Sequence, residues 1–208
     1  MNVGIFKKKP IFGIVRGVKA SQIEPLIETV IEAGLETLEI AMNTPDASEL
    51  IKKVKQVASG RLVLGAGTVL SMEDLKIALK SGATFIVMPV LIKEVVKYCV
   101  KNKIPVFPGA LTPSEIYQAW EAGATMVKVF PAKFFGPEYF REIKGPLNNI
   151  ELLACSGVTS DNLQDYFTAG ATAVTFGGSI FRKDWLADKD FKSIGLEVKR
   201  FIDAWEEM

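Results

Sequence analysis

A short sequence motif that recurs along the chain constrains its fold more than any other feature. It consists of a small residue and a glycine followed by an apolar run, and it occurs four times, at Ala33-Gly34, Ser81-Gly82, Ala122-Gly123 and Ala169-Gly170. Each occurrence is typical of a helix end, a glycine that caps the helix, and a buried strand. Between these lie four further apolar runs, which begin at Ile11, Arg61, Ile104 and Ile150. The sequence therefore predicts eight strands.

Helical patterns separate the predicted strands, and their start signals have a physical basis. Ser21-x-x-Glu24 and Thr112-x-x-Glu115 have the pattern of capping boxes, in which side chains satisfy N–H groups that the first turn of a helix leaves free. Pro113 stands at the first helical position after Thr112. Thr44-Pro45-Asp46 and Ser71 indicate two further helix starts.

Strict alternation of strands and helices, at roughly 26 residues per unit, implies parallel strands joined by right-handed crossovers. We therefore expect an α/β fold, a compact (β/α)8 barrel (TIM barrel) that forms a single domain over residues 1–208. An open doubly wound sheet is the alternative, but residues 16–21 lack the glycine fingerprint that such a sheet would place at its first helix. Residues 2–9 are expected to cover the barrel floor, and residues 190–206 to form the last packing helix.

Composition narrows the chemistry that the chain can carry out. It has no histidine, which excludes a Ser-His-Asp triad, histidine-ligated metals and imidazole acid–base catalysis. Its two cysteines, Cys99 and Cys155, form neither a disulfide framework nor a metal-binding spacing. The net charge is +1 with both signs interspersed, so nucleic acid and membrane surfaces are poor partners. No segment resembles a signal peptide or a membrane span, and we expect a cytoplasmic protein.

An amine in an apolar strand is the clearest chemical signal. Residues 125–130 have the pattern of a buried strand, on which Met126, Lys128 and Phe130 share one face. Burial disfavours a charged amine and leaves a neutral nucleophile for a carbonyl carbon. The alternatives are that Lys128 reaches out of the strand end or pairs with a carboxylate. Glu39 also faces the predicted lumen, either as a partner in proton transfer or in a structural ion pair with Lys128.

Polar residues close most of the predicted strands, where the active sites of barrels lie. They are Arg16, Glu39, Thr68, Lys128, Cys155, Ser156, Gly157, Gly177, Gly178 and Ser179. The glycines after the last two strands suit a phosphate held by main-chain N–H groups, although they are also ordinary turn residues. No lysine or arginine occurs between Cys155 and Ile180, so we expect phosphate recognition mainly by the main chain. Arg16 could instead form a salt bridge with Glu39, and Cys155 could be a small buried hydrophobe.

Seven segments together resemble the family of 2-dehydro-3-deoxyphosphogluconate (KDPG) and 4-hydroxy-2-oxoglutarate aldolases. They are IVRG, TLEIAMNTPDA, GAGTV, FPGALTPSE, VKVFPA, SGVTSDN and FGGS, within residues 8–182. The resemblance implies a class I (Schiff-base) aldolase of carbohydrate metabolism, a carbon–carbon lyase that forms homotrimers and needs no cofactor or metal. Its substrate would be 2-keto-3-deoxy-6-phosphogluconate, cleaved to pyruvate and glyceraldehyde 3-phosphate as in the Entner–Doudoroff route. Related members cleave the galactonate epimer or 4-hydroxy-2-oxoglutarate.

The resemblance also implies roles for individual residues. Lys128 falls on the Schiff-base lysine and Glu39 on the proton-transferring glutamate. The residues implied around the substrate are Arg16 and Thr68 near the pyruvate carboxylate, with Pro89, Cys155 and Ser156. Those implied at the phosphate are Gly157, Gly177, Gly178 and Ser179.

Three departures from the family pattern concern the choice of substrate. Ala154-Cys155-Ser156-Gly157 stands where many members have Pro-Thr-Gly-Gly, Met88 stands where a serine precedes the proline, and Asn43 replaces an arginine of some members. The Asn-Thr-Pro run and residues 135–137 favour the galactonate branch. Two alternatives from other classes are a sugar-phosphate epimerase or isomerase, in which Glu39 abstracts a proton beside Lys128, and a binding protein without activity.

Overall fold

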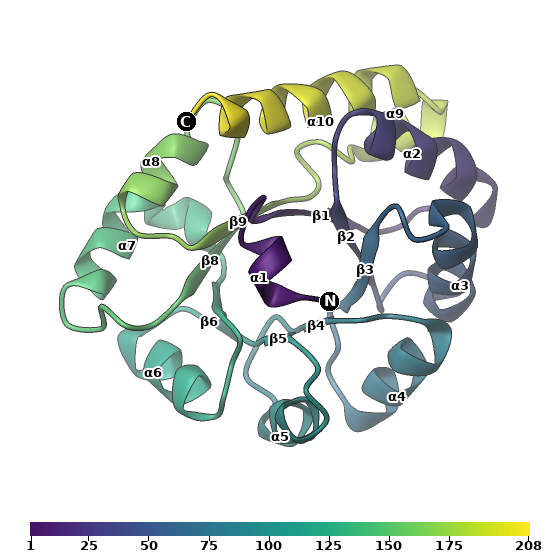
Figure 1. Cartoon of the computed structure of the whole chain (residues 1–208). Helices are drawn as coiled ribbons and strands as arrows, with labels where there is room; N and C mark the ends of the chain where they lie inside the picture. The colour runs from purple at the N-terminus through teal and green to yellow at the C-terminus, as the bar shows by residue number, and fades with distance from the viewer.

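The computed structural model describes all residues, 1–208, and contains nine strands. They are β1 (Ile11–Val15), β2 (Thr37–Ala41), β3 (Val63–Gly67), β4 (Ile86–Val87), β5 (Val106–Phe107), β6 (Gly109–Ala110), β7 (Val127–Val129), β8 (Leu152–Cys155) and β9 (Ala173–Phe176). The sheet order is β5-β4-β3-β2-β1-β9-β8-β7-β6, and all pairs are parallel. Parallel pairing thus runs round a nearly closed barrel, which confirms the predicted fold (Figure 1).

The ninth strand arises because one of the eight expected runs is divided. Pro108 interrupts the run from Ile104, since proline has no N–H group to continue the ladder. The residues before Pro108 pair with β4 and those after it with β7. The Pro108 carbonyl still accepts a hydrogen bond from the Lys128 main-chain N–H at 2.9 Å.

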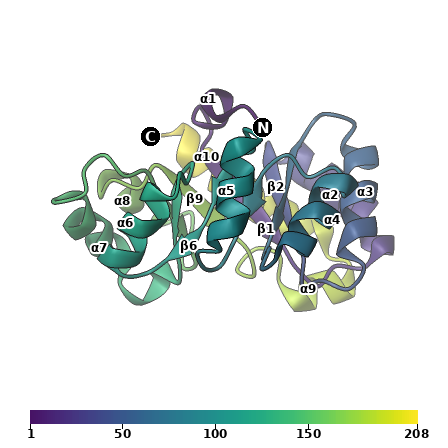
Figure 2. The ribbon, with the colours of Figure 1, turned by 90° about the horizontal axis from the view of Figure 1, so that it is seen from below.

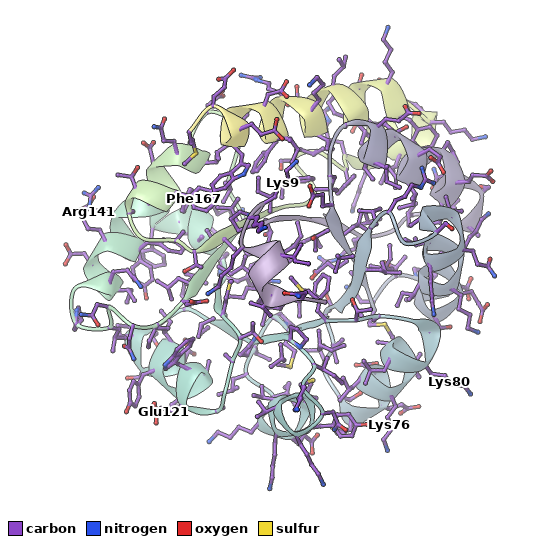
Figure 3. The ribbon with its side chains drawn as sticks, viewed as in Figure 1. Lys9, Lys76, Lys80, Glu121, Arg141 and Phe167 are labelled. Atoms are coloured by element: carbon purple, nitrogen blue, oxygen red, sulfur yellow. The ribbon has the colours of Figure 1, made fainter.

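Helices follow the strands and surround the barrel (Figure 1). They are α2 (Ala20–Glu32), α3 (Ala47–Ala58), α4 (Met72–Ser81), α5 (Lys93–Lys101), α6 (Pro113–Glu121), α7 (Gly136–Lys144), α8 (Leu163–Thr168), α9 (Lys183–Asp188) and α10 (Phe191–Glu206), with a short α1 (Val3–Phe6) and a 3₁₀ turn η1 (Ala132–Phe134). None of them combines the length and the apolar character needed to cross a membrane. Charged side chains such as Lys76, Lys80 and Arg141 point outward from this ring (Figure 3).

The helix ends follow the expected local chemistry with one exception. The four predicted cap glycines all have positive φ, between 89° and 115°, a region that other residues rarely adopt. Thr112 and Glu115 form the predicted capping box, with N–H to oxygen distances of 3.3 and 2.8 Å. The box expected at Ser21 is wrong, because α2 begins at Ala20 and the Gln22 side chain accepts from the Lys19 N–H at 2.7 Å.

Aromatic side chains fill the floor of the barrel. Phe12, Phe85 and Phe107 project into the lumen with ring centroids 5.6 to 6.0 Å apart. Phe6 of α1 closes this cluster from below, at 6.1 Å from Phe12 and 6.3 Å from Phe107. Gly65 leaves the room that this packing needs, since a Cβ there would lie 2.4 Å from the Phe85 ring. The N-terminal segment therefore covers the floor, as predicted.

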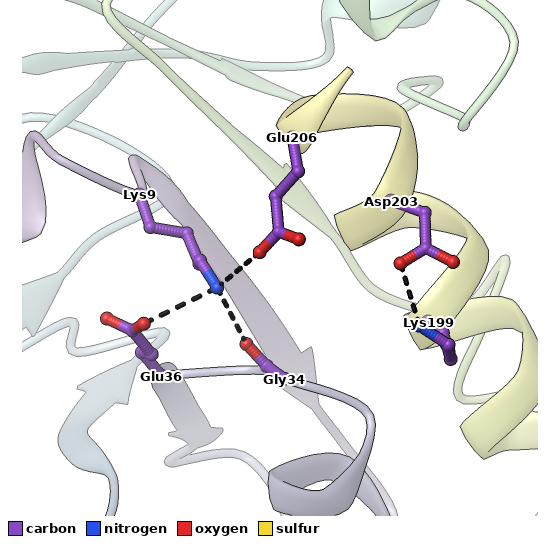
Figure 4. Close-up of polar contacts among 6 residues, drawn as sticks. All are labelled: Lys9, Gly34, Glu36, Lys199, Asp203 and Glu206. Carbon is purple, nitrogen blue, oxygen red and sulfur yellow. Dashed lines mark hydrogen bonds and ion pairs between the residues drawn. The ribbon is translucent and has the colours of Figure 1, made fainter. Parts of the chain in front are cut away.

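The last helix closes the outer ring and is tied to the first strand. Its buried face includes Ile194, Val198 and Phe201, which confirms the predicted packing helix. Lys9 binds Glu206 at 3.0 Å and Glu36 at 3.4 Å through its Nζ (Figure 4). Both ends of the chain thus lie on the floor side of the barrel, opposite α9 (Figure 2).

Candidate active site

The strands end at a cavity of about 1030 Å³ at the mouth of the barrel. Ten of the eleven predicted site residues line it, namely Arg16, Thr68, Pro89, Lys128, Cys155, Ser156, Gly157, Gly177, Gly178 and Ser179. Glu39 is not part of the cavity wall. The structure thus brings these residues to one place, while their individual roles stay predictions.

Lys128 projects into the lumen from β7, directly above the floor. Its side chain is buried, with 6 % of the residue exposed, and Met126 on the same face of the strand is fully buried. The Nζ atom lies 5.3 Å from the centre of the Phe130 ring. No carboxylate lies within 4.0 Å of it, so the alternative of a structural ion pair with Glu39 is wrong. The amine is therefore enclosed but has no anionic partner.

Glu39 is an isolated carboxyl group on β2. It is 1 % exposed, and its Oε2 atom has no hydrogen-bond partner. Gly67 on the neighbouring strand makes room for it, because a Cβ at that position would lie 2.0 Å from Glu39 Oε1. Burial raises the pKa of Glu39 to about 7, while the charges of Lys128 and Arg16 act to lower it. Such a carboxyl group can both accept and donate a proton near neutral pH.

Arg16 and Thr68 close β1 and β3 side by side. The Arg16 Nη2 atom donates a hydrogen bond to Thr68 Oγ1 at 3.1 Å. Arg16 makes no ion pair with Glu39, so the alternative of a salt bridge at the mouth is wrong. A guanidinium group beside a hydroxyl group is a suitable site for a carboxylate.

The turns at Gly157 and at Gly178 differ in the space available for a side chain. Ser156 and Gly157 both have a φ of +82°, and a Cβ on Gly157 would lie 2.5 Å from Lys133 Cβ. A Cβ on Gly178, in contrast, would meet no atom within 4 Å. Close contact in the fold therefore requires glycine at 157, whereas Gly178 borders open space.

Sequence reasoning missed four lysines that line the same cavity. Lys19 and Lys133 lie between a strand and the helix that follows it, Lys183 begins α9, and Lys189 directly follows α9. Together with Arg16 and Lys128 they give the cavity six basic side chains, and no aspartate or glutamate lines it. No strand-end pattern would have found them, because their positions depend on how loops fold over the mouth. A chain with a net charge of only +1 thus concentrates positive charge where an anionic ligand would bind.

A parallel barrel with a buried amine, a buried carboxyl group and several further basic side chains at the ends of its strands has the arrangement of a barrel enzyme, whose active site lies at that face. Residues 3–196 match the family model of the KDPG and KHG aldolases. The chain belongs to this family, whose members are carbon–carbon lyases.

Individual relatives carry two kinds of name. The chain is 31 % identical over 198 residues to the 2-dehydro-3-deoxy-6-phosphogalactonate aldolase of Escherichia coli (strain K12), covering 95 % of this chain and 97 % of that protein. It is 33 % identical over 186 residues to the 2-dehydro-3-deoxy-phosphogluconate aldolase of Haemophilus influenzae, covering 88 % and 87 %. A solved structure described as native KDPGal superimposes with a TM-score of 0.88 at 31 % identity, covering 95 % of both chains. The family is therefore established, and the relatives are divided between two sugar epimers.

Proposed function

We propose that the chain is a class I aldolase in which Lys128 forms a Schiff base with the ketone of a phosphorylated 2-keto-3-deoxy sugar acid. The observation that carries this proposal is the enclosure of the Lys128 amine, without an ion pair, among residues that line a cationic cavity. A neutral amine is a nucleophile for a carbonyl carbon, and a cationic cavity attracts a substrate with a carboxylate and a phosphate.

The reaction requires an electron sink and a group that moves protons. The Lys128 amine adds to the C2 ketone, and loss of water from the carbinolamine leaves an iminium ion. Glu39, directly or through one water molecule, takes the proton of the C4 hydroxyl group as the C3–C4 bond breaks. The electron pair of that bond moves to the iminium to give an enamine, and the aldehyde leaves. Glu39 then returns a proton to C3, and water hydrolyses the iminium to release pyruvate.

The two ends of the substrate would bind at different parts of the cavity. Arg16 and Thr68 would hold the carboxylate of the pyruvate half, since they offer a cation and a hydroxyl group side by side. The turns at Gly157 and at Gly177-Gly178-Ser179 would hold the phosphate through main-chain N–H groups.

We propose 2-keto-3-deoxy-6-phosphogluconate as the substrate, with its C4 epimer, the galactonate compound, as the second candidate. Cys155 lines the cavity where many family members have a threonine, and its thiol offers a sugar hydroxyl group of either epimer only a weak hydrogen bond. Relatives support both candidates, with 31 % identity to a phosphogalactonate aldolase and 33 % identity to a phosphogluconate aldolase. Pyruvate release from the two phosphorylated epimers and from 4-hydroxy-2-oxoglutarate, at equal concentration, would decide the substrate by the largest kcat/KM.

Borohydride trapping tests the proposed chemistry. Incubation with pyruvate and borohydride should leave a reduced pyruvyl group on Lys128, which mass spectrometry of peptides locates. An adduct on Lys133 instead, or no adduct, would contradict the role of Lys128. The absence of any adduct would also fit the epimerase mechanism, in which no covalent intermediate forms.

We also propose a homotrimer. Large apolar side chains are exposed beside the mouth, namely Leu70, Val90, Phe130, Phe134 and Phe135. Such a group of apolar side chains is typical of a surface that another copy of the chain covers. Light scattering after size-exclusion chromatography would test this proposal, and a monomer at micromolar concentration would contradict it.

A further inference from the structure

Five basic side chains line the cavity beside Lys128, namely Arg16, Lys19, Lys133, Lys183 and Lys189. None of them takes part in an ion pair, whereas Lys9, Arg61 and Arg182 each bind a carboxylate. Unpaired cations that share one cavity repel one another, and an anion bound among them would relieve this repulsion. The cavity therefore has unpaired positive charge that an anionic ligand can pair with.

Lys133 differs from the other three lysines that the sequence did not predict, because it touches the turn at Gly157. A Cβ on Gly157 would lie 2.5 Å from Lys133 Cβ and 2.9 Å from its Cα. The preceding residue, Ala132, is the buried first residue of η1. On the other side of the turn, the Gly157 carbonyl accepts a hydrogen bond from Asn162 Nδ2 at 3.0 Å. The base of the Lys133 side chain is therefore fixed against the turn.

The ammonium group of Lys133, in contrast, is held only weakly. Its Nζ atom lies 4.9 Å from the centre of the Phe134 ring and forms no ion pair. A contact between an ammonium group and an aromatic ring is weaker than a hydrogen bond between an ammonium group and a phosphate. The flexible stem of lysine allows the ammonium group to leave the ring when a phosphate is near.

We propose that Lys133 selects phosphorylated substrates, by pairing its ammonium group with the phosphate bound at the turns of Gly157 and Gly178. The proposal rests on the proposed function and deepens it. The sequence from Cys155 to Ile180 contains no lysine or arginine, and this predicts phosphate recognition mainly by the main chain. Lys133 changes this expectation, because it brings a basic side chain to the turns from η1, the segment that follows β7. Phosphate recognition then has a charged part as well as a main-chain part.

The test compares two substrates in Lys133→Gln. For the preferred phosphorylated substrate, kcat/KM should fall roughly 10- to 100-fold, mostly through KM, as for loss of a charged hydrogen bond. For 4-hydroxy-2-oxoglutarate, which has no phosphate, kcat/KM should change less than about twofold. Lys133→Arg should recover most of the loss. Lys97→Gln, at an exposed lysine of α5 outside the cavity, is the matched control and should behave as the unmodified protein.

Inorganic phosphate gives a readout that does not depend on turnover of the sugar. As an inhibitor competing with the phosphorylated substrate, it should bind Lys133→Gln about tenfold more weakly, and the difference should shrink with added salt. Equal losses on both substrates, or unchanged phosphate inhibition, would overturn the proposal. Trapping of pyruvate at Lys128 should persist in Lys133→Gln. Failure of trapping in the unmodified protein would instead contradict the proposed function.

Discussion

The floor and the mouth of the barrel are built from the same strands, but their lumen-facing side chains differ in polarity and packing. At the floor these side chains are apolar and packed, and they include Phe12, Met126 and Leu153. Two residues later on the same strands come Ile14, Lys128 and Cys155, all of which line the cavity. Side chains on one face of a strand recur every second residue, so a step of two residues along a strand leads from the packed floor to the wall of the cavity.

The comparison indicates how the protein maintains unpartnered groups. An isolated buried carboxyl group such as Glu39 lowers the free energy of unfolding when it is charged. The packed aromatic floor directly beneath stabilises the same strands. We therefore expect substitutions at the mouth to affect activity more than stability, and substitutions at the floor to do the reverse.

Replacement of the buried amine should have the largest effect. Lys128→Met should lower kcat/KM by at least about 10⁴-fold and abolish pyruvate trapping, because it removes the nucleophile. The free energy of unfolding should stay equal or increase, since an amine without an ion pair is replaced by an apolar chain of similar length. Steady-state assays and urea denaturation measure the two quantities. A large loss of stability would mean that the mouth contributes to folding as the floor does.

Glu39→Gln should have the second largest effect on activity. Turnover should fall by about 10²- to 10⁴-fold, the usual contribution of a positioned acid or base. Lys128 should still be trapped by pyruvate and borohydride, because addition of the amine to the ketone does not need the C4 proton transfer. An unchanged kcat would remove Glu39 from the mechanism.

At the floor, Phe107→Ala should lower the free energy of unfolding by about 3–5 kcal/mol, because it leaves a cavity in the aromatic cluster. The kcat/KM of the fraction that remains folded should change little. Leu196→Ala, at an exposed apolar side chain of α10 away from the mouth, should change stability by less than about 0.5 kcal/mol. Similar losses in the two variants would show that the floor is not a packed core.

The pH dependence of the free energy of unfolding should also distinguish the mouth from the floor, because the mouth contains the buried carboxyl group of Glu39 and the floor is apolar. The pKa of Glu39 is about 7 in the folded protein against an ordinary value of 4.5, so the folded state holds a proton that the unfolded state loses first. Its contribution to stability is therefore complete below pH 4.5 and is lost as the pH rises through about 7. Relative to the unmodified protein, Glu39→Gln should gain up to about 3 kcal/mol between about pH 5 and pH 8. Urea denaturation at both pH values measures this gain, and a constant difference would contradict it.

The smallest effect is expected at the phosphate turn. Gly178→Val should raise KM for the phosphorylated substrate about tenfold while pyruvate trapping stays normal, because its side chain would enter open space at the ligand. The same proportional loss of kcat/KM with 4-hydroxy-2-oxoglutarate would indicate damage to the barrel rather than to a phosphate site.

Most of the barrel could be predicted because local chemistry determines it. The cap glycines mark four helix ends, and strand periodicity alone places Lys128 and Glu39 in the lumen. Their separation could not be predicted in this way, since it depends on the sheet order, in which β1, β9 and β8 lie between β2 and β7. The missed lysines at positions 19, 133, 183 and 189 lie on loops or on α9, whose folding over the mouth leaves no periodic signal.

The ion pairs of Lys9 with Glu36 and Glu206 have a practical consequence for handling the protein. They fasten the last turn of α10 beside the start of β1, so the first and last residues emerge from the face opposite α9 (Figures 2 and 4). A fusion partner, a purification tag or a solid support joined to either terminus would therefore stand behind the barrel. The cavity would face the solution, and immobilised protein should bind its ligand as freely as protein in solution.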